Sequence, residues 1–226
     1  MPSSRRLVII APVAAAVVVL AFVAPWFYAN VLANDPPEAF ELSNPVDHGT
    51  GEPFDVDGTW AVADGSAAGY RVDEILNGQD VTVVGRTADV RGDLAVAGGT
   101  LTSADVVVDL TTVTTDSASR DGQFATTILQ TTTYPEATFA LTEPVDLGAL
   151  ADGDAIDVTA VGALTIRDTT VDVGAELRAQ GSDDTVEVVG SIPLVFGDVG
   201  ITAPDLGFVK VADHGFVEFH LMLARR

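Results

Sequence analysis

The sequence contains no cysteine and a single lysine, Lys210. Without cysteine the chain has no disulfide framework, no thiol nucleophile and no lipoprotein attachment residue. Lys and Arg together number 11 against 33 Asp and Glu, which gives a net charge of −22. Nucleic-acid binding needs clustered cations against phosphate, so this balance excludes a nucleic-acid partner. The acidity indicates a domain kept soluble by mutual repulsion, with adaptation to high salt as the alternative.

Recognisable catalytic motifs are also lacking. The chain has no Gly-x-Ser-x-Gly elbow and no phosphate-binding glycine loop. Near the C-terminus, His214, Glu218 and His220 have the donor chemistry of a metal site. A solvated or hydrogen-bonded strand face is the simpler interpretation of these three residues. We therefore expect no catalytic residue, no metal and no cofactor, and a metal-dependent enzyme is kept only as an alternative.

One long hydrophobic run is present, at the N-terminus. Leu7 to Tyr28 carries no charge, and it follows Arg5 and Arg6. About 20 apolar residues span a bilayer as a helix, and a positive flank stays cytoplasmic. We expect residues 1–29 to be a single-pass anchor in the cell membrane, with the rest on the extracytoplasmic side. A signal sequence cut after Val31-Leu32-Ala33 is the alternative, although signal cores usually have about 7–15 apolar residues.

The remainder divides into a linker and a β domain. Residues 30–57 are rich in proline and polar residues and have no apolar period, which is typical of a linker. From Gly58 onward, short β-rich runs alternate with turns such as Asn77-Gly78 and Gly98-Gly99. Alternation is clearest over 216–224, where Val217 and every second residue to Leu223 are apolar. Residues 58–226 are therefore expected to form an all-β antiparallel sandwich or barrel.

A single short helix interrupts the β pattern. Asp116 or Ser117 can cap a helix that runs to Leu129, with Phe124 and Ile128 on one face. Such a helix commonly covers one end of a barrel. The aromatic residues spread over the strands and this helix are typical of a packed core, or of the lining of an elongated cavity. An eight-stranded barrel is wide enough for either arrangement.

Several segments together resemble the YceI-like family over Gly58 to Arg226. The matching segments are Trp60-Ala61-Val62, Val84-Gly85-Arg86-Thr87, Ser119-Arg120-Asp121, Tyr134-Pro135 and Gly162-Ala163-Leu164-Thr165-Ile166. The chain departs from the family pattern at Gly65 and Asp168, where the family often has histidine and glycine. The resemblance implies an extended antiparallel lipocalin-like β-barrel that is not a known enzyme. It also implies that a polyisoprenoid or similar amphiphilic chain binds inside the barrel.

These observations lead to an expected function, a membrane-tethered extracytoplasmic protein that binds an isoprenoid or other long-chain lipid. The alternative function is that of a structural or interaction domain with a packed core and no bound lipid. Whether the domain forms a homodimer is left open. For the polar head of a lipid, arginine suits phosphate, and Arg120 beside the helix is preferred. The full set of expected ligand-binding residues is Tyr70, Phe124, Tyr134, Phe139, Leu164, Phe196, Arg71, Arg86 and Arg120.

Overall fold

The computed structural model describes residues 36–43, 55–152, 154–182 and 184–226. The expected membrane anchor, residues 1–29, lies outside these ranges. Within them, no helix has the length and apolar content needed to cross a membrane.

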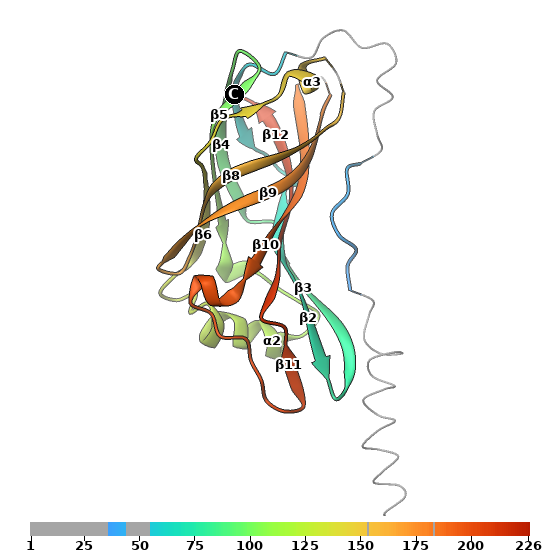
Figure 1. The fold of residues 1–226 in the computed structure, drawn as a ribbon, viewed down its shortest axis with the longest axis vertical. Helices are drawn as coiled ribbons and strands as arrows, with labels where there is room; N and C mark the ends of the chain where they lie inside the picture. Colours follow the sequence, from blue (N-terminus) through green and yellow to red (C-terminus); the bar gives the residue numbers. More distant parts are fainter. Residues whose placement is uncertain (1–35, 44–54, 153, 183) are drawn as a thin grey trace, which may run out of the picture.

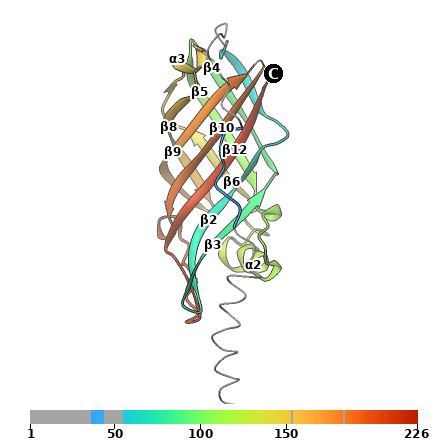
Figure 2. The same cartoon turned by 90° about the vertical axis from the view of Figure 1, so that its right-hand side faces the viewer.

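Eight antiparallel strands close into a barrel (Figures 1 and 2). In order around the barrel they are β1 (Gly58–Val62), β4 (Val90–Ala97), β5 (Thr100–Asp109), β6 (Glu136–Leu141), β8 (Ile156–Ile166), β9 (Thr169–Ser182), β10 (Thr185–Val195) and β12 (His214–Arg225). Strand β1 then pairs with β12 and completes the ring. The expectation of an all-β antiparallel barrel is confirmed.

Four further strands extend this barrel, and three of them lie at one end. Strand β2 (Ala67–Leu76) continues alongside β12 where β1 stops, and it pairs with β3 (Gln79–Thr87) and β11 (Val209–Val211). This end, where the β2–β3 turn and β11 lie, is called the mouth end (bottom of Figure 1). The far end carries the β4–β5 turn, the short helix α3 (Gly148–Ala151) and the C-terminus. The fourth strand, β7 (Val145–Asp146), pairs with the start of β5.

The two expected glycine turns are both hairpin turns with positive φ at both central residues. Asn77 and Gly78 have φ of 51° and 81° between β2 and β3, and Gly98 and Gly99 have 60° and 71° between β4 and β5. Such turns match the right-handed twist of paired strands and favour Asn-Gly and Gly-Gly. The local sequence thus specifies which strands are hairpin neighbours.

The expected helix consists of two parts. An α-helix, α2 (Ala118–Gln123), continues as a π-helical turn, η3 (Phe124–Ile128), at the mouth end (Figure 1). The carboxylate of Asp121 anchors it by accepting a hydrogen bond from the Thr115 backbone N–H at 2.9 Å. Ser117 occupies the N-cap position without a side-chain cap bond. Two 3-10 turns, η2 (Leu110–Thr112) and η4 (Phe196–Val199), complete the helical elements of the described chain.

Residues 36–43, part of the expected linker, lie along the outside of the barrel and are called the strap (Figures 1 and 2). At its start, Arg71 donates to the Pro37 carbonyl at 2.8 Å. At its end, the Ser43 backbone N–H and hydroxyl both donate to one carboxylate oxygen of Glu187, at 2.9 and 2.8 Å. Arg71 pairs with Phe216 near the mouth end of β12, whereas Glu187 pairs with Met222 toward its far end. The strap therefore runs from the mouth end toward the far end.

We predict that acid releases the end of the strap from the barrel. Burial alone would raise the pKa of Glu187, but hydrogen bonds from Ser43, Gln180 and His220 lower it below its ordinary 4.5. A lowered pKa in the folded state means that this contact stabilises above the ordinary pKa and is lost as the pH falls through the folded value. A nitroxide on Glu41→Cys should stay immobile from pH 7 to about 4.5 and gain mobility below it.

The control is the same label combined with Glu187→Gln, whose amide does not titrate. Its mobility should not change with pH while circular dichroism shows a folded barrel. An equal acid response in both proteins would contradict a role for Glu187.

Candidate functional site

The barrel encloses an elongated apolar cavity of about 600 Å³. Its walls are the inward-facing side chains of the strands, because alternate residues of a strand point to opposite faces. On β8, for example, Ala160, Leu164 and Ile166 line the cavity, and Thr159, next to Ala160, is exposed. Protein cores rarely contain voids larger than a water molecule, so a space of this size is a candidate binding site.

Small residues at inward positions explain why the interior is open. Of the alanines that line the cavity, five lie on strands β2, β5, β6, β8 and β9: Ala68, Ala104, Ala137, Ala160 and Ala175. Glycines make room for two large rings, since Phe139 packs over Gly162 and Phe219 packs over Gly190. A Cβ on either glycine would lie about 2.3 to 2.5 Å from the ring. The interior therefore has smooth apolar walls.

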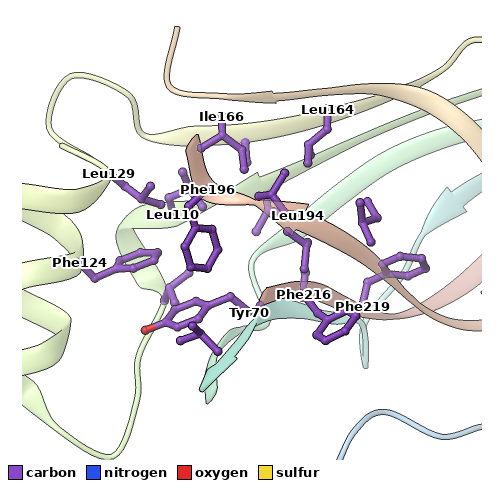
Figure 3. A pocket seen from close by; sticks show the side chains of 18 of the residues that line it. Tyr70, Leu110, Phe124, Leu129, Leu164, Ile166, Leu194, Phe196, Phe216 and Phe219 are labelled. Carbon is purple, nitrogen blue, oxygen red and sulfur yellow. The ribbon is translucent and has the colours of Figure 1, made fainter. Parts of the chain in front are cut away.

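Aromatic rings gather where the cavity approaches the mouth end (Figure 3). The rings of Tyr70 and Phe124 stack with centroids 5.2 Å apart and planes at 11°. Phe196, at the start of η4, points toward them from the opposite wall. Because Phe124 lies in the π-helical turn, this turn supplies one side of the mouth.

The polar groups of the cavity are few and are concentrated near these rings. Arg120 of α2 lies 3.2 Å from a carboxylate oxygen of the buried Glu74, and it also bonds Asp116 one helical turn earlier. Burial raises the pKa of the Tyr70 phenol to about 12, and Arg120 opposes that rise. At neutral pH the tyrosine is therefore a neutral hydrogen-bond donor. The positive charge of Arg120 is balanced by the carboxylates of Glu74 and Asp116.

Six of the nine expected ligand-binding residues line the cavity together. They are Tyr70, Phe124, Phe139, Leu164, Phe196 and Arg120. Tyr134 lies outside the lining, beside Arg167 of the β8–β9 turn, whose guanidinium is 5.8 Å from its ring centroid. Whether any of these side chains contacts a ligand stays a prediction.

Arg71 and Arg86 were expected near the mouth but face away from the cavity. Tyr70 points inward, so its neighbour Arg71 must point outward. There it binds the buried Glu218 at 2.5 Å, and Arg86 lies 3.5 Å from the same carboxylate. Arg86 also donates to the Glu38 carbonyl of the strap and lies 3.9 Å from the Phe40 ring centroid. Both arginines therefore hold the strap on the barrel.

The three residues with metal-ligand chemistry do not converge. His214 pairs with Asp213, Glu218 binds Arg71, and His220 contacts Glu187 at 2.8 Å. Across the described ranges, no group of three or more His, Asp or Glu side chains is placed to hold a metal ion. Each of these residues already has a partner on the outer face or at a strand end.

Some lining residues were not among those expected from the sequence. Leu206 and Phe208, in the loop before β11, border the cavity at the mouth end. This loop has neither a strand period nor a helical one. Glu74 is the acidic partner of Arg120, and its alternation with Tyr70 and Val72 along β2 was the signal that could have identified it.

An eight-stranded antiparallel barrel with an apolar interior and one open end is a lipocalin-like binding fold. A family model described as the YceI-like domain matches residues 60–223, and the chain belongs to this family. No curated protein matches the chain.

Solved structures with the same fold come from several bacteria. A polyisoprenoid binding domain from Saccharophagus degradans, implicated in plant cell wall breakdown, has a TM-score of 0.61 at 22% identity, covering 74% of this chain and 98% of that one. BcnA of Burkholderia cenocepacia has a TM-score of 0.53 at 19% identity, covering 68% and 95%. The YceI protein of Campylobacter jejuni has 0.52 at 14% identity, covering 63% and 84%. At these identities the likeness establishes the fold.

Proposed function

We propose that this protein binds one long apolar lipid, an isoprenoid chain, inside the barrel, and that it is held at the extracytoplasmic face of the cell membrane by residues 1–29. The observation that carries the lipid-binding part is the cavity of about 600 Å³ with its nearly continuous apolar walls. Burying a chain there gains about 25 cal/mol for each Å² of apolar surface removed from water. Binding therefore requires no catalytic group.

Two further observations support an isoprenoid ligand, and a binding protein in preference to a purely structural domain. The structurally similar domain from Saccharophagus degradans is described as polyisoprenoid binding. A purely structural domain would be expected to fill its core, and the alanines of the lining leave this core open. The tether rests on the sequence alone, namely the uncharged run from Leu7 to Tyr28 after two arginines.

Mass spectrometry of an organic extract of the natively purified full chain tests the lipid. A stoichiometric isoprenoid is the expected result, and an empty extract from protein that also fails to take up polyprenol would overturn the proposal. The tether is tested separately, by whether the chain stays with membranes after alkaline extraction.

We predict that Glu74 sets the preference of the site for the head of the lipid. Among the described residues, Arg120 is the only arginine in the lining, and Glu74 competes with any phosphate for it. Replacing Glu74 with Gln removes one negative charge and frees part of the guanidinium. The ratio of affinities for polyprenyl phosphate over polyprenol should rise about fivefold, equivalent to about 1 kcal/mol.

Adding Arg120→Ala to Glu74→Gln should return that ratio toward the unmodified value. Arg91→Ala is the matched control, because Arg91 pairs with Glu136 on the exposed outer face. If the ratio for Glu74→Gln does not differ from that of the Arg91 control, Glu74 has no part in head selection.

A further inference from the structure

The exposed apolar side chains of this barrel are distributed unevenly. In the described part of the chain, five large hydrophobic residues are exposed, namely Ile75, Val195, Leu206, Phe208 and Phe216. Ile75 precedes the β2–β3 turn, and Leu206 and Phe208 lie in the loop before β11. Val195 pairs with His214, where β10 ends and β12 begins. All five therefore lie in the half of the molecule toward the mouth end.

Leu206 and Phe208 are the most exposed of the five, at 56% and 59%. They are held in place by the backbone. The Leu206 N–H donates to the Val209 carbonyl at 2.8 Å, and the Asn77 N–H donates to the Phe208 carbonyl at 2.7 Å. Both residues also border the cavity. Ile75 is exposed on the outer face of the adjoining strand β2, which pairs with β11. These three residues form an apolar patch at one side of the opening, and this set of three is called the rim.

The far end is different in character. The β4–β5 turn there is fixed by the Asp57 carboxylate, which accepts hydrogen bonds from the Gly98 and Gly99 N–H groups. Arg226 pairs with Asp93 beside it at 3.0 Å. No large hydrophobic side chain is exposed at this end within the residues that the structure covers. An apolar partner would meet the molecule at the mouth end.

The course of the N-terminal chain indicates which partner that is. The strap begins in the half of the barrel toward the mouth end, where Pro37 and Glu38 are held by Arg71 and Arg86. Tyr28, the last residue of the expected membrane-spanning run, and Pro36 are eight positions apart in the chain (36 − 28 = 8). Such a segment reaches at most about 26–29 Å when fully extended. A membrane anchor ending at Tyr28 therefore leaves the mouth end, and not the far end, next to the bilayer.

Charge near the rim indicates the kind of bilayer contact. The exposed residues around it include Asp80, Asp198, Asp205 and Asp213, against the single lysine Lys210. Attraction of basic residues to anionic lipid headgroups cannot supply the contact here. Insertion of apolar side chains into the headgroup boundary does not require a positive surface.

We propose that the rim docks on the surface of the lipid bilayer, so that the mouth of the cavity opens directly onto the membrane. This inference rests on the proposed tether and lipid-binding function, and it adds the contact surface and the orientation. A lipid tail would then pass between the bilayer and the barrel without crossing water. Because its surroundings are acidic, this contact gains nothing from anionic lipid.

The absence of cysteine makes the test direct, because one introduced cysteine carries the only label. A nitroxide on Leu206→Cys or Phe208→Cys, in the full chain reconstituted in phosphatidylcholine vesicles, is compared with one on Ala97→Cys beside the far-end turn. Accessibility to oxygen, which concentrates in the bilayer, is measured against that to a water-soluble nickel chelate. We expect this ratio to be several-fold higher at the rim positions than at Ala97, and not to rise when a fifth of the lipid is anionic.

Equal, water-like ratios at the rim and at Ala97 would overturn the proposal, as would failure of the chain to float with the vesicles. Dipolar broadening between rim labels would also overturn it, because it would mean that a second copy of this chain covers the rim. The amount of lipid in an organic extract is measured by mass spectrometry on the same preparations. A loaded barrel with a water-exposed rim rejects only the docking, and an empty barrel with a bilayer-exposed rim rejects only the proposed ligand.

Discussion

Replacing Ala160 with Phe is expected to lower the affinity for the bound lipid by about 5- to 150-fold, since overpacking costs about 1–3 kcal/mol. Ala160 is only 2% exposed and lines the cavity from the middle of β8, opposite Ala175 of β9. A phenyl ring at this position occupies space that the lipid would fill. The lipid-free protein should keep or gain stability, because the ring fills a void that costs free energy when it is empty.

The matched control is Thr159→Phe, which places the same ring on the exposed outer face of the same strand. Lipid content after native purification and polyprenol affinity are measured for both proteins, together with the midpoint of thermal unfolding. Unchanged affinity in a folded Ala160→Phe protein would mean that the lipid does not use the barrel interior.

Replacing Trp60 with Ala should have the largest effect on stability, a loss of about 3–5 kcal/mol in the free energy of unfolding. Trp60 is 2% exposed on β1, the short strand that closes the barrel between β12 and β4. Its indole N–H donates to the Val56 carbonyl at 2.9 Å, and the Arg225 guanidinium lies 4.7 Å from its ring centroid. At about 2–4 °C for each kcal/mol, the unfolding midpoint should fall by about 6–20 °C.

Trp60→Phe separates the two contributions of this side chain. It keeps most of the buried ring and removes the indole N–H, so the expected loss is about 1–2 kcal/mol. Denaturant unfolding of lipid-free protein measures both variants. A loss below about 1 kcal/mol for Trp60→Ala would mean that the seam between β1 and β12 does not depend on this residue.

The sequence was most informative where a local period sets the structure. The alternation of Val217, Phe219, Leu221 and Leu223 correctly predicts the inward face of β12, and the two glycine turns correctly predict their hairpins. The helix was also expected at the position where α2 and η3 lie. Its π-helical second half was not expected, and this is the part whose Phe124 stacks on Tyr70 of a distant strand.

The outward position of Arg71 could have been predicted from the sequence. Adjacent strand residues point to opposite faces, so Tyr70 and Arg71 could not both enter the cavity. The strap could not have been predicted in this way. Ser43 is fastened by Gln180 and Glu187, more than 130 residues later in the chain, and no local pattern brings such residues together. The same holds for the rim, whose loop follows no period.

The strap also has a mechanical consequence. It is bound at intervals from Pro37 to Ser43, and it lies lengthwise along the barrel wall. A pull on residue 36 away from the barrel, parallel to its long axis, would load these contacts in shear, so that several must break at once. The same force applied perpendicular to the wall would peel them off one at a time. A domain fastened in this way resists being drawn off along its axis but yields to a sideways force.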